Sequence, residues 1–306
     1  MRRLPPLEGL TIIFLGITLL LVIFFYPRFP HGSRLLARFI PLILLALALS
    51  KVRRRRGGAK TIRFLCDFSP IFFVIAIYEW LADLIPYLCP NMDDLLIRID
   101  LALFGVHPTV WLERISRPWL TELLSSVYAS YYFVPVTLIT ILYFWGEEKE
   151  FSLTIFTLLL GYYISFLGYI TIPSIGPRFT LASVQEVPLR GGSIAEFVMH
   201  ILDLLERNKW DCFPSGHTQM VLISLWFAFK YKRVLYWTYL PIVITLIFAT
   251  VYLRYHYVVD IVAGFAFAGG TLLVGPAIWR WWVREKTDRF GRSCISSPPR
   301  PLSPSA

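Results

Sequence analysis

Apolar residues dominate long continuous stretches of this chain, and polar residues collect between them. We count about eight such stretches, at residues 9–26, 34–50, 67–88, 119–144, 151–172, 216–230, 234–253 and 258–282. They are rich in Leu, Ile and Phe, without the ten-residue alternation of a transmembrane β-strand. Because a helix needs about 20 mostly apolar residues to cross a bilayer core of roughly 30 Å, we expect about eight spans, of which 34–50 and 216–230 are the shortest.

The composition is that of a membrane protein. Of the 306 residues, 56% are hydrophobic and 16% are charged, whereas soluble domains have about 45–50% apolar and about 25% charged residues. A soluble fold, a disordered chain and a fibrous repeat are therefore excluded. The net charge of +10 could indicate nucleic-acid binding, but the basic residues lie in short runs, as in loops that face a cytoplasm and anionic lipid. We expect membrane lipids as partners and no nucleic acid.

Basic clusters set the orientation of the predicted spans. The strongest is 51–56, between the second and third spans; 230–233 lies between the sixth and seventh, and Arg280, Arg284 and Lys286 follow the last. With eight spans, all three clusters share one side with both termini, which the positive-inside rule makes cytoplasmic. Three arginines around the first loop of the opposite side run against this rule: Arg28, Arg34 and Arg38.

The opposite side also receives two longer segments, roughly 89–118 and 173–215. In the second, the spacing of apolar residues over 193–210 predicts a helix lying in the membrane interface. The N-terminal apolar run has no small-x-small cleavage site, which favours an uncleaved span over a signal peptide. The four cysteines form no CxxC pair, although Cys89 and Cys212 fall on one side and could pair.

Candidate chemistry lies where the last spans begin. Pro214-Ser215-Gly216-His217 opens the sixth apolar stretch, and Pro and Gly suit a tight turn into a helix. A helix N-terminus offers free N–H groups and the positive end of the dipole, so it is a ready anion site over which His217 would stand. Ser215 could instead be a simple N-cap.

A second group combines an imidazole with a carboxylate. His256 and Asp260 are four residues apart, which on a helix places both on one face. The carboxylate could hold the Nδ1–H and leave Nε2 as a nucleophile. An ionisable residue inside a span is a functional hypothesis by default. A structural pair, or a metal site of His217, His256 and Asp260, are the alternatives.

These groups, with Arg178 just beyond the fifth span, resemble the motifs of the type 2 phosphatidic acid phosphatase (PAP2) superfamily. Pro-Ser-Gly-His is its second motif, and His256 with Asp260 partly meets its third, Arg…His-x-x-x-Asp. The resemblance implies that His256 is a nucleophile that forms a phosphohistidine, that Asp260 orients it and that His217 protonates the leaving group. It also implies a phosphate site without a metal or other cofactor, made by Arg178, Arg254, Ser215 and the backbone of Gly216.

The chain departs from the family pattern at two motifs. The third-motif Arg usually stands six residues before the His, where this chain has Thr250. Arg254 is only two before His256, so it needs a bent, non-helical segment to reach the site. The usual first-motif Lys is replaced by Thr171. With the sequence His-Tyr-Val-Val-Asp over 256–260, these departures make the chain similar to the inositol-phosphorylceramide-synthase (aureobasidin-target) and sphingomyelin-synthase branch.

The expected fold is all-α, a polytopic transmembrane bundle of about eight spans with a PAP2-like six-helix catalytic core. Residues 1–66 would add two spans and the basic loop, 67–284 would form the catalytic membrane domain, and 285–306 a disordered tail. The expected protein is a membrane phosphohydrolase or phosphotransferase acting on a lipid phosphoester, in a bacterial inner membrane with its site facing the periplasm. A head-group transferase of the inositol-phosphorylceramide-synthase type is one rival, and a non-catalytic lipid-binding or transport protein is the other.

Overall fold

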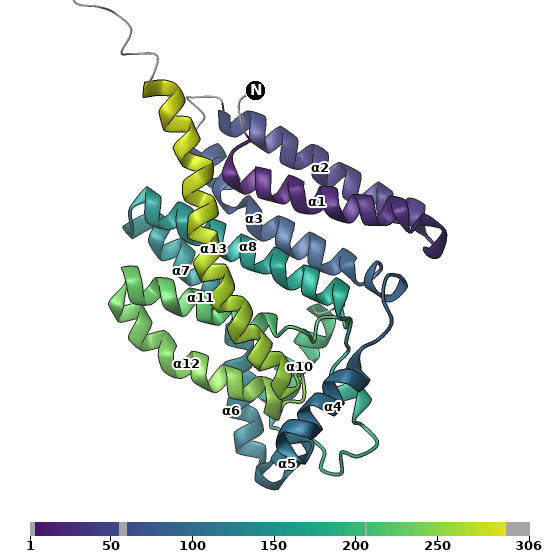
Figure 1. The fold of residues 1–306 in the computed structure, drawn as a ribbon. Helices are drawn as coiled ribbons and strands as arrows, with labels where there is room; N and C mark the ends of the chain where they lie inside the picture. The colour runs from purple at the N-terminus through teal and green to yellow at the C-terminus, as the bar shows by residue number, and fades with distance from the viewer. Residues whose placement is uncertain (1–3, 55–59, 206, 292–306) are drawn as a thin grey trace, which may run out of the picture.

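The structure is a computed structural model that describes residues 4–54, 60–205 and 207–291, and every regular element in these ranges is a helix (Figure 1). The α-helices are α1 (Pro6–Phe24), α2 (Gly32–Arg54), α3 (Lys60–Leu81), α4 (Asp93–Phe104), α5 (Pro108–Trp111), α6 (Pro118–Ala129), α7 (Phe133–Trp145), α8 (Glu148–Thr171), α9 (Pro177–Thr180), α10 (Ser193–Leu205), α11 (Gly216–Tyr231), α12 (Arg233–Tyr252) and α13 (Val258–Gly291). Short 3-10 helices are η1 (Tyr26–Arg28), η2 (Ile85–Tyr87), η3 (Leu112–Ile115) and η4 (Ser130–Tyr132).

Within the described residues, seven helical segments are long and apolar enough to cross a membrane. They are α1, α2, α3, the combined α6–α7 segment, α8, α12 and most of α13. The predicted stretch 216–230 is α11, whose 16 residues rise about 24 Å, less than a bilayer core; most of its side chains are buried. A pair bent by 61°, α4 with the α5–η3 segment, is the other candidate for a span. The all-helical membrane bundle is therefore confirmed, with seven clear spans where the sequence suggested about eight.

Local sequence explains several helix ends. Pro118 occupies the first turn of α6, where a missing N–H does no harm. Gly105 ends α4 with a φ of +70°, a left-handed conformation that glycine adopts without strain. At the start of α8, Glu147 and Glu150 form a reciprocal capping box, which satisfies two N–H groups that the helix leaves unpaired.

The predicted interfacial helix is α10, which ends at Leu205 and not at residue 210; residues 207–210 are not helical. Its apolar side chains Ile194, Phe197 and Leu204 are 58%, 64% and 65% exposed, as expected of a helix that rests on lipid. Its N-terminus is fixed by Glu122 of α6, whose carboxylate accepts hydrogen bonds from the backbone of Gly192, Ile194 and Ala195. The helix is thereby attached to the bundle at one end.

The basic segments gather at one end of the bundle. Arg63 of α3 pairs with Glu148 of α8 at 2.6 Å, and the ammonium of Lys232 donates to the carbonyl of Trp145 at 2.6 Å. The start of α3 and the α7–α8 and α11–α12 connections therefore lie together. The segments 212–217 and 254–260 lie at the opposite end, where α11 and α13 begin (Figure 1).

The α1–α2 hairpin lies alongside α3 and α8 (Figure 1). Phe14 stacks on Tyr163 of α8 with ring centroids 4.5 Å apart, and Thr11 Oγ1 lies 2.9 Å from Tyr163 Oη. The sequence-based division at residue 66 falls inside α3, so the hairpin and the predicted catalytic part meet within one helix. Residues 285–291 of the predicted tail continue α13, and the rest of that tail lies outside the described residues.

A partly buried ionic cluster joins the first three helices. Arg53 of α2 donates to Glu8 of α1 at 2.5 Å and also to Asp67 and the carbonyl of Cys66 in α3. The side chains of Glu8 and Asp67 are 1% and 10% exposed. Because a buried carboxylate is unfavourable without a partner, Arg53 stabilises two charges at once.

We therefore expect Arg53→Gln to lower the stability of the bundle by about 3 kcal/mol, since removing one partner of a buried pair typically has an effect of about 3–5 kcal/mol. The measurement is thermal unfolding of the purified protein in detergent. Lys51→Gln, the same charge change at an exposed position of the same helix, is the control. Equal midpoints for the two variants would show that the cluster contributes nothing.

Candidate active site

The turn before α11 brings His217 to the end of the bundle. Ser215 is the N-cap of α11, and its Oγ accepts a hydrogen bond from the N–H of Thr218 at 3.2 Å. The N–H of Ser215 donates to the carbonyl of Asp260 at 3.1 Å. The second-motif turn is therefore bonded directly to the helix that carries the third-motif aspartate.

The connection between α12 and α13 places His256 in a turn, not on a helix. The carbonyl of Thr250 accepts hydrogen bonds from the N–H of Tyr255 at 2.9 Å and of His256 at 3.1 Å. Arg254 has a φ of +66°, in the left-handed region that few non-glycine residues adopt. This is the bent segment that the sequence required if Arg254 was to reach the site.

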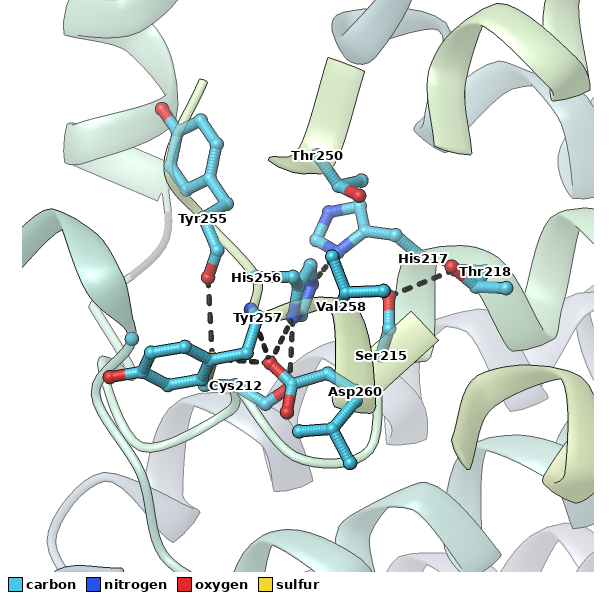
Figure 2. Close-up of polar contacts among 12 residues, drawn as sticks. Cys212, Ser215, His217, Thr218, Thr250, Tyr255, His256, Tyr257, Val258 and Asp260 are labelled. Atoms are coloured by element: carbon cyan, nitrogen blue, oxygen red, sulfur yellow. Dashed lines mark hydrogen bonds and ion pairs between the residues drawn. The ribbon is translucent and has the colours of Figure 1, made fainter. Parts of the chain in front are cut away.

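The two histidines converge. His217 Nδ1 lies 3.2 Å from His256 Nε2, and His256 Nδ1 lies 2.8 Å from the carbonyl oxygen of Cys212 (Figure 2). A carbonyl oxygen can only accept, so Nδ1 of His256 carries the proton and Nε2 has the free lone pair. His217 Nδ1 is then the donor in the contact between the rings. His256 is thus held in the tautomer that a nitrogen nucleophile needs.

Asp260 supports the turn more closely than it holds the imidazole. Its Oδ2 accepts the N–H of Tyr257 at 2.8 Å and the thiol of Cys212 at 2.9 Å, and lies 3.5 Å from His256 Nδ1 (Figure 2). Burial raises the pKa of the Cys212 thiol well above its ordinary value, so the group stays protonated and donates. Cys212 therefore contacts the candidate nucleophile with its carbonyl and the candidate orienting aspartate with its thiol.

A small cavity lies beside the two rings. Its volume is about 30 Å³, larger than the roughly 10–15 Å³ that one buried water needs. Both histidines line it, together with Arg178 and Arg254. The Nε of Arg254 and the Nε2 of His217 are buried and have no hydrogen-bond partner among the described residues. The Nε of Arg254 is a cationic donor suited to an oxyanion, and the Nε2 of His217 can donate to the same group when the imidazole is protonated.

Arg254 is held by its terminal nitrogens. Nη2 donates to Glu113 Oε1 at 2.8 Å and to the carbonyl of Val187 at 2.5 Å, and Nη1 donates to Gln185 Oε1 at 3.0 Å. Burial lowers the pKa of Arg254, and the charge of Glu113 opposes this shift; an arginine remains charged in proteins. These bonds fix the orientation of the group and leave its Nε edge without a partner.

Arg178 approaches the same cavity from the loop after α8. Its guanidinium forms a bidentate ion pair with Asp203 of α10, at 2.8 and 3.0 Å, and lies over the ring of Tyr255. The carboxylate of Asp203 thus binds the guanidinium group of Arg178, which the sequence analysis expected to bind phosphate. Since carboxylate and phosphate present similar pairs of oxygens, the geometry is compatible with an exchange of one for the other.

Ser215 and Gly216 do not line the cavity in this structure. Ser215 has no exposed surface, and its hydroxyl serves as the N-cap. Gly216 allows close packing, because a Cβ there would lie 2.2 Å from the phenolic oxygen of Tyr169. The structure brings together the other five residues expected from the sequence, and the phosphate-binding role of these two stays a prediction.

Acidic residues that the sequence reasoning did not assign hold the site turns in place. Asp93 accepts the N–H groups of Ile175 and Gly176, at 2.8 and 2.9 Å, and the hydroxyl of Tyr257 at 2.8 Å. It thereby joins the loop of Arg178 to the turn of His256. The only feature of the sequence that could have indicated this role is the presence of acidic residues in the segment before α6.

Asp100 and Glu113 act in the same way. Asp100 accepts the first two N–H groups of α13, those of Val258 and Val259, each at 2.9 Å. Glu113 accepts the N–H groups of Glu186 and Val187, at 3.2 Å each, besides its ion pair with Arg254. Backbone N–H groups that no helix satisfies are therefore bonded to carboxylates.

Two further features bear on the chemistry. Asp211 lines the cavity and accepts the hydroxyl of Tyr78 at 2.7 Å; burial raises the pKa of its carboxyl. Cys212, His256 and Asp260 present ligand atoms within 4.8 Å of one another, a donor set that zinc accepts. In the structure Cys89 and Cys212 are both free thiols, so the pairing left open by the sequence is not formed.

Comparison with known proteins was made for families, curated proteins and solved structures. A family model described as the PAP2 superfamily matches residues 95–274, more than half of the 306-residue chain. The searches of curated proteins and of solved structures found no match. The matched range contains both histidines, Asp260 and both arginines of the cavity. The chain belongs to the PAP2 superfamily.

Proposed function

We propose that this protein transfers a phosphoryl-type group from a membrane lipid through a phosphohistidine on His256. Membership of the PAP2 superfamily supports a phosphatase- or phosphotransferase-type function. The observation that carries the finer proposal is the convergence of His256 Nε2, His217 and the unpaired Nε of Arg254 on one cavity. A nucleophile, an acid and an oxyanion donor are the parts that such a transfer requires.

In the first step, His256 Nε2 attacks phosphorus and the bond from phosphorus to the lipid oxygen breaks. The imidazolium form of His217 gives its proton to that departing oxygen. The hydrogen bond between the rings is released at this point, since the lone pair of Nε2 now forms the nitrogen–phosphorus bond. The Cys212 carbonyl keeps the Nδ1 proton of His256 in place.

In the second step, an acceptor hydroxyl attacks phosphorus and the nitrogen–phosphorus bond breaks. Its proton passes to His217, which restores both histidines. Arg254 and Arg178 stabilise the charge on the phosphoryl oxygens in both steps. Water as acceptor makes the enzyme a phosphatase, and a lipid alcohol makes it a transferase of the inositol-phosphorylceramide-synthase type.

The substrate we propose is a lipid phosphoester, because the cavity lies at one end of a membrane bundle beside the exposed apolar face of α10. By the positive-inside rule this end faces outward, with the basic clusters in the cytoplasm; a bacterial inner membrane is the setting we propose. The experiment is product analysis with the purified protein on labelled phosphatidate, phosphatidylglycerophosphate, polyprenyl pyrophosphate and a phosphosphingolipid. Each is supplied with and without ceramide or diacylglycerol, which separates hydrolysis from transfer.

If the protein is instead a non-catalytic lipid-binding or transport protein, the same set of lipids should give a different result. We then expect no turnover of any lipid, although vanadate, a phosphate analogue, would still bind in a manner that depends on His256.

Replacing His256 by Ala should lower turnover at least about a thousandfold, because it removes the bond-forming atom. His200→Ala, at an exposed position of α10, should retain the rate of the original chain. Rapid quenching with alkaline detergent, which preserves the acid-labile nitrogen–phosphorus bond, should trap label from a ³²P-labelled lipid on the original protein and none on the His256→Ala variant. Turnover by that variant within tenfold of the original would rule out the covalent scheme.

Treatment with EDTA should leave turnover unchanged, because arginine and imidazole groups supply the charge stabilisation in this scheme. EDTA could abolish turnover only if a metal ion were needed, and Cys212, His256 and Asp260 present a set of ligand atoms that could hold one. Loss of activity in EDTA that zinc restores would replace the phosphohistidine scheme by a metal-dependent one.

Replacing Arg254 by Lys should weaken vanadate inhibition about tenfold or more, with the protein still folded. A lysine keeps the charge but lacks the planar fork that satisfies Glu113 and Gln185 while presenting Nε to the cavity. Arg98→Lys, at an exposed position on α4, is the matched control. Equal inhibition constants for the two variants would exclude Arg254 from phosphate binding.

A further inference from the structure

A second cavity lies at the same end of the bundle, away from the histidines. Its volume is about 200 Å³, and it is lined by Phe29, Pro30, His31, Arg34, Leu35, Arg38, Ala82, Asp83, Pro86, Tyr87 and Arg207. We call it the arginine cavity. Ten of its residues come from the α1–α2 connection, the start of α2 and the segment that follows α3. Only Arg207 falls inside the range matched by the family.

Positive charge exceeds negative charge on the walls of this cavity. Three guanidinium groups, from Arg34, Arg38 and Arg207, face one carboxylate, that of Asp83. Asp83 pairs with Arg38 and, at 2.6 Å, with Arg207. Arg34 has no ion pair or side-chain hydrogen bond among the described residues. Glu79, which interacts with Arg207, is not part of the lining.

The start of α2 adds to this positive potential. Arg34 and Arg38 are four residues apart on α2, so they project from one face, where like charges destabilise a helix unless an anion lies between them. The carbonyl of His31 accepts the N–H groups of Arg34 and Leu35, so His31 is the N-cap of α2, which begins at Gly32. The positive end of the α2 dipole therefore lies beside the cavity, whose wall includes His31, Arg34 and Leu35.

These arginines are the residues that the orientation rule does not explain. Basic residues are normally concentrated on the cytoplasmic side, yet Arg34 and Arg38 lie near the start of α2, at the opposite end from the basic residues of its last turn and from the 230–233 connection. Their charge is therefore not a topology signal. A binding role accounts for it, because basic side chains at a membrane surface attract the headgroups of anionic lipids.

The walls also include apolar groups. Leu35 is buried, Phe29 is buried against Tyr87 with ring centroids 5.9 Å apart, and Tyr87 is half exposed. A cavity that joins guanidinium groups to apolar rings at the level of a membrane boundary is matched in chemistry by a phosphate group attached to acyl chains.

We propose that the arginine cavity binds the phosphate group of an anionic lipid headgroup, at a site separate from the histidine cavity. Arg34 supplies the unpaired guanidinium, Arg38 and Arg207 exchange part of their contact with Asp83 for phosphate oxygens, and the α2 dipole adds positive potential. The site is formed where the N-terminal hairpin meets the segment after α10, and Arg207 directly precedes Asn208 and Lys209, which line the histidine cavity. The inference does not depend on phosphotransfer.

The test is calorimetric titration of the full-length protein in detergent with short-chain phosphatidylglycerol, short-chain phosphatidylcholine and inorganic phosphate. All chains carry His256→Ala, so that no lipid is consumed and any binding at the histidine cavity is common to every sample. Arg34→Gln and Arg38→Gln should weaken phosphatidylglycerol binding about tenfold, the effect of losing one hydrogen bond to a charged group. Asp83→Asn should strengthen it severalfold.

Arg28→Gln is the matched control. Arg28 belongs to the same connection, donates to the carbonyl of Leu88 and lies over the Phe25 ring, but it does not line the cavity. Its binding should equal that of the parent. Arg34→Gln breaks no side-chain contact among the described residues, so it should fold normally, and gel filtration checks this.

The titration with inorganic phosphate shows whether the site binds a lipid headgroup or a free anion. Weakening by Arg34→Gln for phosphatidylglycerol alone supports a lipid ligand, and equal weakening for inorganic phosphate supports a free anion at the same site. If Arg34→Gln and Arg28→Gln bind phosphatidylglycerol alike, or if Asp83→Asn weakens binding, the proposal is wrong. Neither result depends on whether the protein turns over a lipid.

Discussion

The site depends on carboxylates that bond to backbone N–H groups of its turns. A turn at the end of a membrane bundle has N–H groups with no helical partner, and burying them without acceptors is unfavourable. Asp93 satisfies the loop at 175–176, Asp100 the start of α13, and Glu113 the loop at 186–187. The α4–η3 segment thus positions three turns that are distant in sequence.

This dependence gives a physical reason for the extent of the family match. The match begins at residue 95, well before the first motif residue, Arg178. Without Asp100 and Glu113 the start of α13 and the Arg254 guanidinium would lose their acceptors. The motifs contribute the candidate reacting groups, and the preceding acidic segment fixes their mutual distances, as the proposed two-step transfer at one phosphorus would require.

The sequence predicted the elements better than it predicted the contacts. Continuous apolar stretches predicted the seven membrane-spanning helices, although the stretch 216–230 is the shorter helix α11. His217, His256 and Asp260 lie together as expected, although His256 lies in a turn and not on the helix of Asp260. The requirement for a bent segment at Arg254 also followed from helix geometry and is satisfied by its positive φ. Asp93 and Glu113 could not be found in this way. Their partners include backbone N–H groups far along the chain, and nearly every residue type has such a group, so the sequence does not show which one a carboxylate will bind. Similarly, Gly216 is explained by the nearby Tyr169 hydroxyl, which no local pattern reveals.

The substitution of Thr250 for the usual third-motif arginine has a structural counterpart. The carbonyl of Thr250 accepts two N–H groups of the turn that follows α12, and Arg254 of this turn lines the cavity. The guanidinium therefore comes from the turn itself and not from the preceding helix. A charge mounted on a turn needs fixed partners to stay in position, since a turn lacks the helical hydrogen bonds that would hold it. Glu113, Gln185 and the Val187 carbonyl supply those partners, so the displaced arginine and the acidic segment are two parts of one arrangement.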